Sequence, residues 1–127
     1  MFNYCELPDI MDLASVRRCY IEFLFDYQHH TLSKEEKIIA FNQLLEILQR
    51  APSGQVDDKV LDELSKFVSN NIDYDDIENI DVALTIIVSL KLKVAWHTII
   101  KQKKNISDNR VLAIVDECIE QYSTLFS

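Results

Sequence analysis

Residues 75–90 read DDIENIDVALTIIVSL and decide the fold class of the chain. Two acidic residues open the stretch, where they suit the positive N-terminus of a helix. Apolar residues then recur at helical spacing, and in the second half they cover much of the circumference, as in a helix buried on several sides. The sequence therefore predicts a central helix from residue 74 or 75 to Leu90, with Ile77, Ile80, Leu84, Ile87 and Val88 facing the core.

Three more helices are predicted before this stretch by the same apolar periodicity. The first runs from Pro8 and Asp9 to Tyr27, because proline suits the first turn of a helix. The second runs from Lys34 to Arg50, and its start is marked by the capping box Ser33-Lys34-Glu35-Glu36. The third runs from residue 57 or 58 to Ser69.

Two helices are predicted after Leu90. Lys91-Leu92-Lys93 indicates a tight corner, and a fifth helix then runs to Lys104. Ser107-Asp108 supplies the cap of a sixth helix. The predicted core-facing residues are Val94, Ala95, Thr98 and Ile99 in the fifth helix, and Val111, Leu112, Val115, Cys118, Ile119 and Tyr122 in the sixth.

The composition supports one all-α domain that spans residues 1–127. This length is near the usual size of a domain, and 48% of the residues are apolar. The single glycine, Gly54, argues against β-rich folds and nucleotide-binding α/β folds, which use glycine for tight turns. The last four helices can form two HEAT-like helical hairpins, or all six can form a compact irregular bundle; the sequence leaves both open.

The charge of the chain is concentrated in one segment. The formal net charge is −8, and residues 57–81 hold nine acidic side chains against only Lys59 and Lys66. One interpretation is that these acids complement two helix dipoles and solvate a surface. Two helix starts need only two or three acids, so the excess predicts a docking surface for a basic protein. The candidate contact residues are Asp62, Asp73, Tyr74, Asp75, Asp76 and Glu78, and tyrosine is a frequent interface anchor.

Other kinds of site are disfavoured by the sequence. A strongly acidic surface would repel nucleic acid and anionic membranes. Asp73-x-Asp75-Asp76 lacks the glycine and glutamate of a calcium loop, and Cys5, Cys19 and Cys118 have neither disulfide nor zinc spacing. No catalytic or nucleotide-binding motif is present. The sequence thus predicts a non-enzymatic protein without cofactor or metal, and free thiols with no signal peptide predict a cytoplasmic location.

A family resemblance comes from the second half of the chain. It rests on Asp76-Ile77-Glu78, Val82-Ala83-Leu84, Ala95-Trp96, Ile99-Ile100, and Ser107-Asp108 before Val111. With this pattern, residues 75–122 resemble the helical-repeat half of small bacterial immunity proteins, which neutralise polymorphic or contact-dependent growth-inhibition toxins. The resemblance implies a small, acidic, cytosolic and non-catalytic protein that covers the active site, or an adjacent surface, of a cationic nuclease. It transfers no individual binding residue, so the candidate contacts rest on the charge alone.

The predicted function is therefore a protein-binding module, an immunity protein that blocks a cationic toxin by steric and electrostatic means. One alternative is a helical adaptor that binds a protein partner through an apolar surface, which an exposed aromatic patch near Phe23 or Phe25 would favour. Another is a small regulatory subunit or a homodimer with the first helix at the interface. The oligomeric state does not follow from the sequence.

Overall fold

The computed structural model describes residues 13–27, 31–50 and 57–126, and the structural statements below concern these residues. They form helices and contain no β-strand, which confirms the predicted all-α fold. The start predicted for the first helix, at Pro8, lies outside the described residues. The α-helices are α1 (Leu13–Tyr27), α2 (Lys34–Arg50), α3 (Asp58–Asn71), α4 (Ile77–Leu90), α5 (Lys93–Gln102) and α6 (Asn109–Tyr122), and the 3-10 helices are η2 (Lys103–Asn105) and η3 (Ser123–Phe126).

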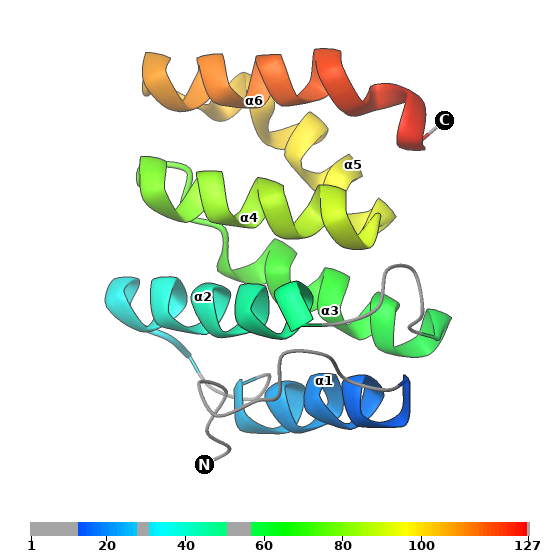
Figure 1. The fold of residues 1–127 in the computed structure, drawn as a ribbon. Helices are drawn as coiled ribbons and strands as arrows, with labels where there is room; N and C mark the ends of the chain where they lie inside the picture. Colours follow the sequence, from blue (N-terminus) through cyan, green and yellow to red (C-terminus); the bar gives the residue numbers. More distant parts are fainter. Residues whose placement is uncertain (1–12, 28–30, 51–56, 127) are drawn as a thin grey trace.

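The helices pack in two layers (Figure 1). In one layer α3 packs between α1 and α5, and in the other α4 packs between α2 and α6. The pairs α1–α2 and α3–α4 also contact each other across the layers, so consecutive helices form stacked hairpins. Of the two arrangements left open by the sequence, the described residues adopt the stack, in which each hairpin buries its apolar face on its neighbours.

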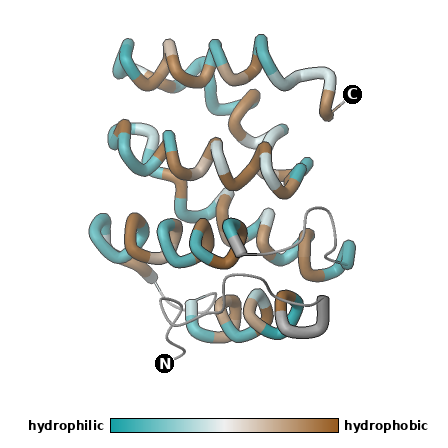
Figure 2. The backbone as a smooth tube through the Cα atoms, viewed as in Figure 1, coloured by the Kyte–Doolittle hydropathy of each residue, from teal (hydrophilic) through white to brown (hydrophobic). Residues whose placement is uncertain are grey.

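One continuous hydrophobic core lies between the two layers and receives residues from all six α-helices. Figure 2 shows the alternation of hydrophobic and hydrophilic residues along each helix that an amphipathic element requires. Aromatic rings fill the core between α1 and α3, where the ring of Phe23 meets that of Phe67 edge-on with centroids 5.2 Å apart. The central position of α4 explains why its sequence is apolar on several sides, since neighbours cover it on three.

The predicted helix ends at Ser33, Lys91 and Asp108 are confirmed. The Glu36 N–H donates to the Ser33 hydroxyl over 3.2 Å, and the Ser33 N–H donates to the Glu36 carboxylate over 3.0 Å, which completes the capping box. Asp108 caps α6 by accepting from the Arg110 N–H. Lys91 forms the corner after α4 in the left-handed conformation, with φ of 55°. Helices commonly end with one residue in this conformation, which is usually a glycine and here is a lysine.

One of the predicted core-facing positions is wrong. Val94, predicted to face the core, is 46% exposed, whereas Trp96, which the prediction did not include, is buried. The reason is that α5 packs on α3 and buries the face that carries Ala95, Trp96 and Ile99, which leaves Val94 on the solvent side. The Trp96 ring instead stacks on Phe126 of η3 with centroids 4.3 Å apart, a partner far along the chain that helical spacing cannot reveal.

Candidate partner-binding surface

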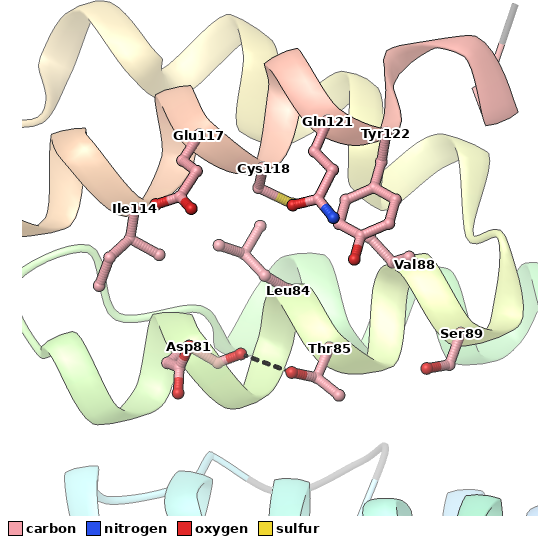
Figure 3. Close-up of a pocket in the computed structure, with 10 residues that line it drawn as sticks. All are labelled: Asp81, Leu84, Thr85, Val88, Ser89, Ile114, Glu117, Cys118, Gln121 and Tyr122. Carbon is pink, nitrogen blue, oxygen red and sulfur yellow. Dashed lines mark hydrogen bonds between the residues drawn. The ribbon is translucent and has the colours of Figure 1, made fainter.

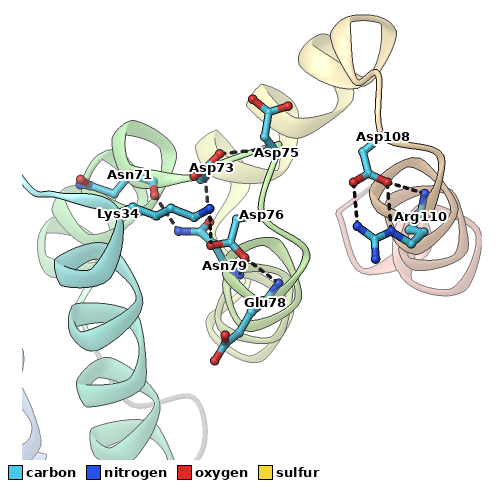
Figure 4. A network of polar contacts seen from close by, with 9 residues as sticks. All are labelled: Lys34, Asn71, Asp73, Asp75, Asp76, Glu78, Asn79, Asp108 and Arg110. Carbon is cyan, nitrogen blue, oxygen red and sulfur yellow. Dashed lines mark hydrogen bonds and ion pairs between the residues drawn. The ribbon is translucent and has the colours of Figure 1, made fainter.

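The acidic loop between α3 and α4 is held by its own side chains (Figure 4). The Asp73 carboxylate accepts from the Asp75 N–H over 3.0 Å, and the Asp76 carboxylate accepts from the N–H groups of Glu78 and Asn79. Asp76 is therefore the N-cap of α4, which is why this helix begins at Ile77 rather than at residue 74 or 75. Two of the candidate contact residues, Asp73 and Asp76, therefore stabilise the loop and the start of α4.

A buried amide fixes the same loop from beneath. The Asn79 side chain is 1% exposed; its oxygen accepts from the Asp73 N–H over 2.8 Å and its nitrogen donates to the Asn71 carbonyl. Lys34 of α2 also reaches the Asp76 carboxylate, with Nζ 3.8 Å from Oδ2. The loop consequently has contacts with α2, α3 and α4, and these contacts fix its conformation in the free protein.

Tyr74 is placed differently from an exposed interface anchor. Its side chain is half-buried and packs against the core, and burial raises the pKa of its phenol. Its hydroxyl is buried and has no hydrogen-bond partner among the described residues. The tyrosine therefore contributes to packing under the loop, and of the acids next to it Asp75 is the exposed one.

Asp62 does not lie with the other candidate residues. Because α3 is covered by α1 and α5 within its layer and by α4 behind it, its exposed residues point away from the layer of α4. Asp62 lies on that outer side, where it pairs with Lys66, whose Nζ is 3.3 Å away. Asp57, another acid of the same segment, lies at the far end of α3 and bonds to Arg17 over 3.0 Å. The acidic segment is thus divided between two faces of the molecule.

The free face of α4 is uniformly acidic and polar. Neighbours cover this helix on three sides, so its exposed side chains all point outward from the layer of α2, α4 and α6. These exposed residues are Glu78, Asp81, Thr85 and Ser89, which bring two carboxylates, two hydroxyls and no basic group. Of the six residues chosen from the sequence, Glu78 belongs to this surface. Asp81 also belongs to this surface. It is one of the nine acids counted in residues 57–81, but it was not chosen as a candidate contact.

A groove follows this face between α4 and α6 (Figure 3). It has a volume of about 340 Å³ and is lined by residues of both helices. Leu84 extends from α4, and Glu117, Gln121 and Tyr122 extend from α6, toward the space between the two helices. The described residues that line the groove include two carboxylates, those of Asp81 and Glu117, and none of them is basic. Its lining residues are Asp81, Leu84, Thr85, Val88, Ser89, Ile114, Glu117, Cys118, Gln121 and Tyr122.

A second groove lies between α1 and α3 and has a different character. It has a volume of about 320 Å³, and Ile21 and Phe25 of α1 lie on its rim. Phe25 is 80% exposed and Ile21 is 40% exposed. The charged lining residues are Arg17, Lys59 and Glu63, so this groove combines an apolar surface with mixed charge. Its sequence signal was the run of aromatic residues in the first helix.

The described residues 13–27, 31–50 and 57–126 contain no group of three or more histidine, cysteine or acidic side chains placed to hold a metal ion. Within the same residues, no helix has the length and hydropathy to cross a membrane. Cys19 and Cys118 are buried free thiols, and burial raises the pKa of both. A raised thiol pKa reduces the thiolate that a nucleophile or a metal ligand requires.

Comparisons with protein-family models, curated proteins and solved structures give no match to this chain.

Proposed function

We propose that this chain is a non-catalytic binding module that neutralises a basic protein by covering it, as an immunity protein covers a cationic toxin. The observation that carries the proposal is the free face of α4, where Glu78 and Asp81 are exposed without a basic neighbour on the same helix. The α4–α6 groove beside it adds Glu117, and none of its described lining residues is basic. A surface of one sign steers an oppositely charged partner and competes with the phosphates that a nuclease attracts.

The layered fold supports this role in a second way. A rigid helical stack presents side chains at fixed spacing, and a pre-organised surface loses little entropy when it binds. The central helix α4 is fixed by α2 and α6 within its layer and by α3 behind, while Asp76 and Asn79 fix its first turn. Steric blocking needs such a surface, because a compliant one would move aside from the partner's active site.

The test is an affinity capture from lysate of the source cells, comparing wild type with the triple variant E78Q/D81N/E117Q. We expect wild type to retain a protein of net positive charge, identified by mass spectrometry, in low salt and less of it in high salt. The variant should retain at least ten-fold less, because three carboxylates are removed from one face. The captured protein is then purified, and its activity or its toxicity on co-expression is measured with and without the chain.

Either of two results would overturn the proposal. One is that the captured partner is retained equally by wild type and by the triple variant at all salt concentrations. The other is that the partner keeps its full activity when saturated with the chain, since blocking would then be absent. The variant E35Q/D75N/E120Q, which loses three exposed carboxylates outside the free face of α4 and its groove, serves as the matched control for charge.

One observation also supports the adaptor alternative. Phe25 and Ile21 expose apolar surface next to the α1–α3 groove, on the side of the molecule away from the free face of α4. A helical adaptor or regulatory subunit would bind its partner there, through contacts that salt does not weaken. Capture that F25S abolishes and E78Q/D81N/E117Q leaves intact would select this function instead.

A further inference from the structure

The α4–α6 groove has two chemically different ends. Along α4 the lining begins with Asp81 and ends with Val88 and Ser89, a separation of roughly 10 Å at the rise of an α-helix. Among the described lining residues, only Asp81 and Glu117 carry a carboxylate, while Tyr122 supplies an aromatic ring from the last turn of α6. Beyond the far end stands Lys91, at the corner that ends α4.

The floor of the groove is apolar and closed. Leu84 is 5% exposed and Cys118 is 9% exposed, and both belong to the hydrophobic core. Ile114 and Val88 are half-buried beside them. A long aliphatic stem laid along this floor would remove apolar surface from water while leaving its charged head at the rim.

We propose that the groove receives a basic segment of the protein partner, with an arginine side chain at the Asp81–Glu117 end and an apolar side chain at the Tyr122 end. The inference rests on the proposed function and names the chemistry of its contact. Charge complementarity sets the orientation, because the two carboxylates attract the cation and Lys91 repels it from the opposite end. Arginine suits the site because its aliphatic stem can lie on the apolar floor and its guanidinium always carries the positive charge that the carboxylates of Asp81 and Glu117 attract.

The spacing defines the segment that fits. A partner helix lying along the groove would place the arginine and the apolar residue about seven positions apart, since both helices rise by about 1.5 Å per residue. The apolar residue would contact Val88 and Tyr122, and the hydroxyls and amide of Thr85, Ser89 and Gln121 line the way between the two ends. This is recognition of a helix in a groove by two anchors.

The test uses a synthetic helical peptide with one arginine and a leucine seven positions later, and a second peptide with citrulline in place of the arginine. Citrulline keeps the shape of arginine and removes its charge. We expect amide NMR signals of residues 81–89 and 114–122 to shift on titration with the arginine peptide. The citrulline peptide should bind about ten-fold more weakly, the effect of losing a charge-assisted contact.

Two variants of equal charge locate the effect. D81N/E117Q should lower the affinity for the arginine peptide to that for the citrulline peptide, whereas D75N/E120Q, with both substitutions outside the groove, should retain the difference. Circular dichroism and thermal unfolding establish that both variants are folded. The inference is overturned if wild type binds the two peptides equally or not at all, or if the two variants weaken binding to the same extent.

Failure here is distinguishable from failure of the proposed function. If the peptides do not bind the groove, the affinity capture still tests independently whether the chain retains a basic partner. It also tests whether E78Q/D81N/E117Q weakens that capture. If that capture persists while D81N/E117Q alone has no effect on it, the partner contacts the free face of α4 at Glu78 and leaves the groove empty.

Discussion

The hydroxyl of Ser65 on α3 accepts a hydrogen bond of 2.8 Å from the backbone N–H of Ala95, in the first turn of α5. The residue before α5, Leu92, makes no capping bond with its side chain. A neighbouring helix therefore supplies the cap that the local sequence lacks, and it does so from a buried position. This bond also fixes the axial position of α5 relative to α3.

Ser65→Ala should lower the free energy of unfolding by about 1–3 kcal/mol, because it leaves a buried N–H without an acceptor. Ser69→Ala on the same helix is the matched control, since the Ser69 hydroxyl is buried and has no partner among the described residues. That variant should be neutral or slightly stabilising. Urea unfolding measures both, and an equal loss in the two variants would contradict the capping role of Ser65.

Asp76→Ala should destabilise the chain by about 1–2 kcal/mol, because the carboxylate accepts two N–H bonds at the start of α4. Asp75→Asn, one position earlier, should change the free energy of unfolding by less than about 0.5 kcal/mol. The comparison separates the acid that caps α4 from the exposed acid next to it. A large loss in the Asp75 variant would mean that its carboxylate is also structural.

Phe23→Ala should cost about 3–5 kcal/mol, because the ring is fully buried and packs edge-on against Phe67. Phe25→Ala, two residues later, should be nearly neutral, because that ring is 80% exposed. Thermal unfolding followed by circular dichroism suffices for both. A strong loss of stability in the Phe25 variant would show that its ring is covered in solution.

Stability should depend on pH through Asp57. The side-chain hydrogen bond from Arg17 is the main cause that lowers the pKa of Asp57 below its ordinary value of 3.8, and the Val60 N–H adds to it. A depressed folded pKa contributes stability that is present above the unfolded pKa and is lost as the pH falls through the folded pKa. The difference in unfolding midpoint between wild type and Asp57→Asn should therefore shrink as the pH falls below about 4. A difference that is constant or grows toward acid would refute this assignment.

The features predictable from the sequence are those that local spacing determines. The capping box at Ser33, the cap at Asp108 and the corner at Lys91 each follow from residues within one turn, and the structure has all three. Apolar periodicity also identified buried residues such as Ile80 and Val115. In these cases the physical cause is contained in the segment itself.

The features that escaped prediction depend on distant partners. Ser65 became a cap because α5 packs on α3, and Trp96 turned inward to meet Phe126. The acidic candidates could be counted but not assigned to faces, since the layer of each helix decides where Asp62 and Glu78 point. The groove beside Asp81 needs Glu117, which lies on a different helix.

The helices of one layer run antiparallel to those of the other, and this direction affects the electrostatic field of the layer of α2, α4 and α6. The helices α2, α4 and α6 begin at the same edge of the stack (Figure 1), and acids at Glu36, Asp76 and Asp108 sit at those starts. Each helix start carries roughly half a positive elementary charge that fades within the first turn. These edge acids are thus partly compensated by their own peptide dipoles, whereas Glu117 lies well beyond the first turn of α6 and retains its full field. Two of the edge acids are also paired with bases, Asp76 with Lys34 and Asp108 with Arg110, so an approaching cation is attracted more strongly by Glu117 in the middle of α6.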